Sequence, residues 1–333
     1  MVYGFMRADL EQKVRDFLVS AEPDRDNKFN STAMNPAHVA RAAGFDPALI
    51  RTVGYRPLDR RQHYNSPAWN DRPRPDLVAA WGAKNVALFC LPSGTNAGPA
   101  AWAYSDYPDR HAFRGSYGGY AFPLFDRRAG QGPYNLKAEL VAALGAAYGS
   151  AVTPEAVFDA MLCLLSARSY TLRFAEDLED VFPHIPFPSD RALFDEAARL
   201  GAEIRAVETF ARPPGADYLR GLARAQTAAT GVLAPVTWVS GDIRICADGS
   251  GHISNIPAVI WEFAVSGYRL LPRWLAAREG MTIGPTFIPE LRDVAARIAE
   301  LIDLFDAADS ILDRTLDDSL SRAALALEGA EIE

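Results

Sequence analysis

Long apolar runs are missing from this sequence of 333 residues, and their absence excludes a class of protein. No stretch of about 18 consecutive apolar residues occurs, so no transmembrane helix is predicted. Residues 1–17 carry charges where a secretory signal peptide would need an apolar core. We therefore expect a cytoplasmic protein that has no membrane partner.

Cysteine is scarce as well, with three residues at Cys90, Cys163 and Cys246. Their odd number and wide separation argue against a disulfide framework and against a zinc site. The five histidines show no HxH or HExxH spacing, so no metal site is predicted.

The motifs of common catalytic and cofactor-binding sites are also missing. No GxGxxG follows a predicted strand, and no GxxxxGK[ST] phosphate loop occurs. The DNA-methyltransferase signature, in which an aromatic residue, Asp or Asn precedes Pro-Pro and an aromatic residue, is absent too. The sequence therefore predicts no catalytic residue and no cofactor.

Positive charge is present mainly as arginine, because only 4 of the 34 basic residues are lysine. A GC-rich coding sequence would explain this bias, although arginine also suits bidentate contact with guanine and phosphate. Residues 300–333 hold ten acidic residues and two arginines, which accounts for the whole net charge of −8. By contrast, residues 51–74 carry a local charge of +4, and such a basic segment is what phosphate contact requires.

The pattern of apolar residues predicts an α+β fold, with an irregular β-rich module containing long loops and a helical, bundle-like C-terminal part. Short apolar runs at 85–91 and 120–125 alternate with turn-rich stretches, whereas 133–230 is mostly helical. We expect three parts, at residues 1–132, 133–262 and 263–333.

Several element boundaries are readable from capping and turn residues. Helices are predicted over 8–19, from a cap at Asn35-Pro36 to Gly44, from Thr153-Pro154, and from Ser189. A β-hairpin is predicted from strands 236–239 and 243–246. The last helix repeats its apolar residues in steps of three and four, at Leu291, Val294, Ile298, Leu301, Phe305, Ala308 and Leu312. Its opposite, acidic face is expected to be solvated.

Three blocks stand out in a fixed order along the chain. The first is GYRPLDRR at 54–61, which is followed by DRPR at 71–74. The second, at 161–188, is an apolar helix with a break at Ser-Ala-Arg-Ser-Tyr and a proline-rich exit. The third is IWEFAVSGYRLLPRWLAAR at 260–278.

Together these blocks resemble the C-terminal target-recognition region of type ISP restriction-modification enzymes and their single-chain type IIG relatives. Leu58 replaces a phenylalanine of the family pattern, and Ser266 replaces a glycine. The resemblance implies a non-catalytic domain that recognises a DNA sequence for an adenine-N6 methyltransferase. Its implied partners are double-stranded DNA and a methyltransferase or nuclease domain or subunit, without a cofactor of its own.

Ten residues are the candidates for DNA contact: Arg56, Arg60, Arg61, Arg72, Arg74, Arg110, Arg114, Arg168, Tyr170 and Arg173. Arg56 could instead pair with Asp59 within a turn, and the side chains at the helix break could cap carbonyls. Adjacent arginines are expected to be the better candidates, because they seldom all find partners inside the protein. Replacing Arg60 and Arg61 together by alanine is expected to weaken binding to all DNA sequences.

Two other functions fit the same sequence. The chain could be a protein-interaction scaffold in a restriction or phage-defence complex, with the acidic C-terminal helix docking a partner. It could also be a hydrolase whose Asp, His or Ser residues converge only in the folded chain.

Overall fold

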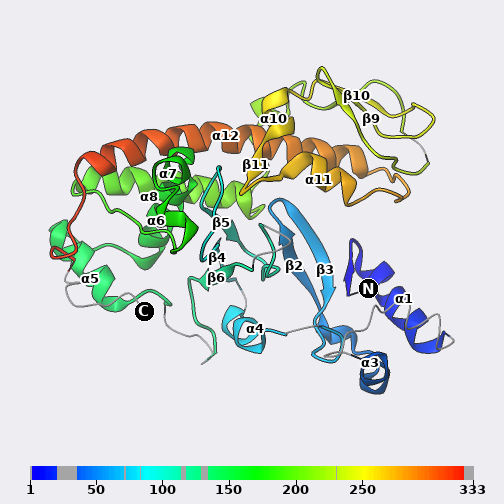
Figure 1. The fold of residues 1–333 in the computed structure, drawn as a ribbon, viewed down its shortest axis with the longest axis horizontal. Helices are drawn as coiled ribbons and strands as arrows, with labels where there is room; N and C mark the ends of the chain where they lie inside the picture. The colour runs from blue at the N-terminus through cyan, green and yellow to red at the C-terminus, as the bar shows by residue number, and fades with distance from the viewer. Residues whose placement is uncertain are drawn as a thin grey trace.

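Helices and small antiparallel sheets alternate along the chain, which confirms the predicted α+β class (Figure 1). The structure is a computed structural model, and it describes residues 2–20, 36–70, 73–82, 84–113, 118–128, 134–229 and 231–325. No helix within these ranges is long and apolar enough to cross a membrane.

The N-terminal residues form a small module with its own apolar core. Helices α1 (Arg7–Val19) and α3 (Ala37–Ala43) lie beside a three-stranded sheet, with a short 3-10 turn at Pro47–Leu49. Its strand order is β1 (Tyr3–Gly4), β3 (Asp59–Tyr64), β2 (Ile50–Arg56). The core side chains are Leu10, Val14, Phe17, Ala37, Ala40, Ile50, Tyr64 and Trp69. Both predicted helices are confirmed; the proposed cap at Asn35 lies outside the described residues.

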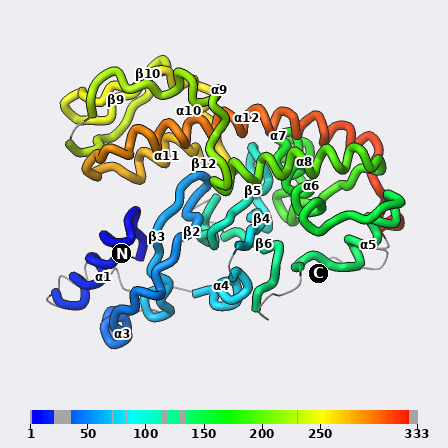
Figure 2. Tube along the Cα trace, turned by 180° about the vertical axis from the view of Figure 1, so that it is seen from behind, coloured from blue at the N-terminus to red at the C-terminus, as the bar shows by residue number. Residues whose placement is uncertain are grey.

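A second small sheet lies next to this module (Figures 1 and 2). Helix α4 (Pro75–Trp81) leads into the order β5 (Ala101–Tyr104), β4 (Ala87–Cys90), β6 (Tyr120–Pro123). The strands predicted at 85–91 and 120–125 are therefore present.

The helical part packs against the buried face of that sheet. It contains α5 (Ala138–Ala147), α6 (Pro154–Ser166), α7 (Arg168–Arg173), a 3-10 turn at Asp177–Glu179, α8 (Arg191–Glu208) and α12 (Phe287–Asp317). The predicted break after residue 166 is confirmed. Helix α8 is capped by Asp190, one residue later than predicted, because its carboxylate accepts hydrogen bonds from two backbone N–H groups of the first turn. All seven seam residues predicted in the last helix are buried.

Close approach of α6 and α8 depends on one glycine. A Cβ placed on Gly201 would lie 1.8 Å from the carbonyl oxygen of Asp159. The Asp159 side chain in turn receives two hydrogen bonds from Arg205, at 2.6 and 2.9 Å. The missing side chain at Gly201 and the ion pair between Asp159 and Arg205 therefore allow α6 and α8 to pack closely.

The remaining elements form a lobe along the N-terminal end of α12 (Figure 1). They are α9 (Ala216–Leu219), a sheet ordered β7 (Arg224–Ala225), β10 (His252–Ser254), β9 (Asp242–Arg244), β8 (Trp238–Val239), then α10 (Ala258–Glu262), the hairpin β11 (Ala264–Val265) and β12 (Tyr268–Arg269), and α11 (Leu270–Ala276). The hairpin predicted around Ser240–Gly241 is confirmed with shorter strands, and Asp242 belongs to β9 rather than to the turn.

Candidate nucleic-acid interface

The first and third sequence blocks meet through a buried ion pair. The Nη2 atom of Arg278, at the end of the third block, donates to Oδ1 of Asp59 at 2.9 Å. Asp59 begins β3 directly after the hairpin turn of the first block, and both side chains are buried. The other Asp59 oxygen accepts from Arg61 at 2.8 Å. Burial lowers the pKa of Arg278, whereas the adjacent Asp59 carboxylate opposes that shift.

Aromatic rings enclose these paired charges. The guanidinium carbon of Arg61 lies 3.6 Å from the ring centre of Tyr55, and that of Arg278 lies 3.7 Å from the ring centre of Trp274. Such cation–π contacts are strongest where water is excluded. Asp59 and Arg61 of the first block therefore take part in the contact that joins the hairpin β2–β3 to the third block.

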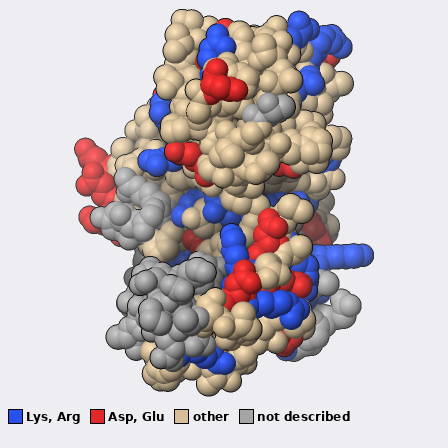
Figure 3. All heavy atoms as spheres, turned by 90° about the vertical axis from the view of Figure 1, so that its right-hand side faces the viewer, with Lys and Arg blue, Asp and Glu red and all other residues tan. Residues whose placement is uncertain are grey.

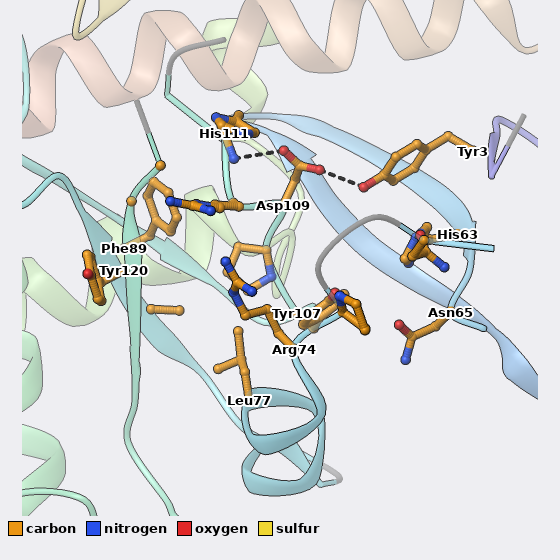
Figure 4. Close-up of a pocket in the computed structure, with 17 residues that line it drawn as sticks. Tyr3, His63, Asn65, Arg74, Leu77, Phe89, Tyr107, Asp109, His111 and Tyr120 are labelled. Carbon is orange, nitrogen blue, oxygen red and sulfur yellow. Dashed lines mark hydrogen bonds between the residues drawn. The ribbon is translucent and has the colours of Figure 1, made fainter. Parts of the chain in front are cut away.

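Arg56 does not pair with Asp59, so the alternative of a pair within the turn is wrong. Its Nη1 lies 3.2 Å from Oδ1 of Asp109, because the hairpin turn points Asp59 toward α11 instead. Asp109 also accepts from the Tyr3 hydroxyl at 2.6 Å and from the backbone N–H of His111 at 2.8 Å. This carboxylate thus ties β1, β2 and the loop after β5 together (Figure 4).

A cleft of about 710 Å³ opens beside Asp109, between the N-terminal module and the sheet β5-β4-β6 (Figure 4). Its walls carry two of the predicted DNA-binding residues, Arg74 and Arg110, and both side chains are exposed. Asn65 and the aromatic rings of Tyr107 and Tyr120 also line it. The cleft therefore offers positive, amide and aromatic groups in one concave surface.

His63 forms part of the cleft wall and is held as a neutral ring. It stacks on Tyr3 with ring centres 4.6 Å apart, and its Nε2 lies 2.6 Å from Oδ1 of Asn70. The Asn70 amide nitrogen donates to the carbonyls of Tyr64 and Ser66, so its oxygen must face His63, whose Nε2 therefore carries the hydrogen. Burial lowers the pKa of His63, and the hydrogen bond to Asn70 only partly offsets this.

The adjacent arginines Arg60 and Arg61 both have partners within the protein, so the expectation that they would lack them is wrong. Arg60 Nε lies 2.7 Å from Asp106, and its Nη2 donates to the Thr209 carbonyl at 3.0 Å. Arg61 is bound to Asp59, as described above. The partners of Arg60 could not be predicted from the sequence, because Asp106 and Thr209 are remote along the chain.

The residues at the helix break face α12 instead of a cleft. Arg168 pairs with Asp306, and Arg173 pairs with Asp313. Tyr170 is buried, and its hydroxyl donates to the His184 carbonyl, so this side chain packs in the core. The acidic face of α12 is accordingly not simply solvated, because it binds the arginines of α7. Arg72 and Arg114 lie outside the described residues.

Charges on the outer surface are mixed. On the face that includes the N-terminal module, basic and acidic side chains are interspersed (Figure 3). Within the described ranges, no group of three or more His, Cys, Asp and Glu side chains is arranged to hold a metal ion. The cleft brings exposed arginines and aromatic rings together in one concave surface.

Comparison with known families identifies the chain. A model of the type ISP C-terminal specificity domain matches residues 1–303. The chain belongs to this family. The resemblance read from the three sequence blocks is thereby confirmed, and DNA target recognition in a restriction-modification system is the function that goes with it. No curated protein matches the sequence.

Solved structures share the fold of this specificity domain. A nuclease-deletion mutant of the type ISP restriction-modification enzyme LlaGI, in complex with a DNA substrate mimic, has a TM-score of 0.66 at 16% identity, covering 92% of this chain and 26% of that one. The structure of the ATP-dependent type ISP enzyme LlaBIII bound to DNA has a TM-score of 0.65 at 14% identity, and the match covers 92% of this chain and 22% of that one. The DrdV–DNA complex has a TM-score of 0.65 at 16% identity, and the match covers 95% of this chain and 34% of that one. The specificity domain thus spans about a quarter to a third of these chains.

Several residues of the specificity domain that line the cleft were missed in the sequence. Asn65, Tyr107 and Tyr120 carry no charge and match no motif, and they come from three separate loops or strands. The aromatic residues in the turn-rich stretch between 104 and 120 were the one available signal, since exposed loops often carry binding residues.

Proposed function

We propose that this specificity domain recognises DNA through the cleft between its N-terminal module and the sheet β5-β4-β6. The observation that carries the proposal is the coincidence of exposed Arg74 and Arg110 with amide and aromatic side chains in one concave surface. Arginine contacts phosphate or guanine, and amides contact base edges. The Tyr107 hydroxyl is protonated at neutral pH, as in any ordinary tyrosine, and burial and the Asp109 carboxylate raise its pKa further, so it can donate a hydrogen bond.

Base contacts would have to supply much of the affinity in this arrangement. The formal charge over residues 1–299 is zero, and non-specific DNA binding depends on clustered positive charge. We infer weak non-specific binding at physiological salt, together with selective binding to a short sequence. Arg72 and Arg114 belong to the same proposed contact set because they neighbour Arg74 and Arg110 in the sequence.

We also propose that the domain is not itself catalytic and acts in the cytoplasm. It would position a methyltransferase or nuclease that is either fused to it in a longer protein or supplied as a separate subunit. Support comes from the structural relatives, which are three to five times as long as the aligned part and are described as restriction-modification enzymes or DNA complexes. A scaffold role would instead predict stable association with such an enzyme and no DNA binding.

The test is a selection of random DNA duplexes on the purified chain at low salt. Enrichment of a motif of several base pairs supports sequence recognition. Retention without enrichment would reduce the function to backbone affinity, and no retention, with co-purification of a methyltransferase, would favour the scaffold.

The cleft itself is tested by replacing Arg74 and Arg110 together by alanine. If each arginine contacts one phosphate, the salt dependence of binding, as the slope of log K against log salt, should fall by about 1.8. The control replaces Arg168 and Arg173, which pair with α12, and its slope should stay unchanged. Equal slopes for both double variants would exclude this cleft as the DNA-binding surface.

A further inference from the structure

Three aromatic side chains form an exposed cluster at one lip of the cleft. Tyr120 and Phe122 are alternate residues of β6 and lie on the same face of the strand. Phe182, from the loop after α7, meets both rings edge to face, with ring centres 5.4 and 5.9 Å away. The three side chains remain 55%, 44% and 37% exposed. A contiguous apolar patch of this kind usually marks a contact surface, whereas isolated exposed hydrophobic residues do not.

The cluster is held in place by its surroundings. A Cβ on Gly119 would lie 2.2 Å from the Phe89 ring, so the absence of a side chain at 119 lets β6 lie close against the core beside Tyr120. On the other side, the Tyr170 hydroxyl donates to the His184 carbonyl and anchors the loop that carries Phe182. These contacts orient the rings before any partner binds, which lowers the entropic cost of binding.

The cluster is continuous with the cleft, because Tyr120 lines the cleft together with Arg74 and Arg110. Phosphate groups have no apolar surface for such rings to bury. In paired DNA the apolar group on a base edge is the C5-methyl group of thymine, which lies in the major groove. A duplex whose phosphates meet the two arginines would place its groove against the adjoining rings.

We propose that the aromatic cluster of Tyr120, Phe122 and Phe182 is a specificity determinant that contacts thymine methyl groups in the major groove. This inference rests on the proposed DNA-binding function of the cleft. It assigns to these uncharged residues the apolar part of base recognition, while Arg74 and Arg110 contribute the charged part.

The test uses the duplex retained most strongly in the selection, synthesised with thymine or with uracil, which lacks only the methyl group. The unmodified chain should bind the thymine duplex more tightly, by about fourfold for each methyl group it buries. Phe122→Ala should lose most of this preference while keeping the salt dependence of binding. Val259→Ala, at another exposed apolar side chain on α10, should keep both properties.

Each other outcome counts against the inference. Equal affinity for the two duplexes overturns it, yet leaves the proposed function intact if the Arg74 and Arg110 double variant still changes the salt dependence. Equal affinity together with loss of methyltransferase binding in Phe122→Ala would assign the cluster to a protein contact. Failure to retain any duplex would overturn both the inference and the proposed function.

Discussion

Arginines contribute to two different surfaces in two regions of this molecule. In the cleft, Arg74 and Arg110 are exposed on walls that also carry amide and aromatic groups. Along the helical layer, Arg168 and Arg173 extend from α7 to carboxylates of α12. The same residue type, equally basic in the sequence, thus lines a concave surface in one region and joins two helices in the other.

This difference depends on acidic partners that lie far away in the sequence. Asp306 and Asp313 are seven residues apart, two turns of α12, and so lie on one face of that helix. Arg168 and Arg173 begin and end α7, which packs on that face. A cluster of arginines therefore identifies a DNA-contact candidate only when the opposing surface of the fold is known.

The largest effect is expected where an arginine and its carboxylate partner are both buried. Arg278→Met should lower the free energy of unfolding by about 3 kcal/mol, because it leaves the buried Asp59 carboxylate with one partner fewer. Chemical denaturation followed by circular dichroism measures the change. The paired variant Asp59→Asn with Arg278→Met removes both charges and should lose less. A single variant as stable as the unmodified chain would show that this ion pair does not hold β3 to α11.

The ion pair between Asp59 and Arg278 is an example of a contact that could not be predicted from the sequence. Periodicity and capping predicted several helices, the break after residue 166 and the strands at 85–91 and 120–125, since these features depend on neighbouring residues. The pairing of Asp59 with Arg278 joins positions 219 apart, and nothing local in either block specifies it. Likewise, the basic segment at 51–74 made Arg60 and Arg61 candidates for DNA contact, together with Arg74, which lines the cleft. Tyr107 and Tyr120 also line the cleft, but they carry no charge and were not predicted. The division into parts at 132 and 262 stays a prediction.

A smaller effect is expected at the cleft wall, where His63 is buried without a charge. Its folded-state pKa lies below the ordinary value of about 6.5, so folding favours the neutral ring. Stability from this group is fully present above that value and is lost as the pH falls below it toward the folded-state pKa. The loss per unit of pH cannot exceed about 1.4 kcal/mol, which corresponds to one proton.

Denaturation midpoints measured from pH 8 down to pH 5 should therefore fall more steeply for the unmodified chain than for His63→Phe. The phenylalanine ring preserves stacking on Tyr3 but cannot take up a proton. Parallel curves for the two proteins would mean that His63 titrates as it does in the unfolded chain.

The smallest effect should come from making the helical region resemble the cleft. Asp306→Asn with Asp313→Asn leaves Arg168 and Arg173 without their carboxylate partners on α12. Both ion pairs are partly exposed, and exposed pairs contribute at most about 1 kcal/mol each, so the fold should persist with little change in stability.

Two released arginines could steepen the salt dependence of DNA binding by at most about 1.8, if DNA reaches this surface. Because the cleft lies elsewhere, we expect a change well below that limit, measured by titrating one duplex at several salt concentrations. A change as large as the one produced by replacing Arg74 and Arg110 would mean that DNA also reaches the face where α7 meets α12.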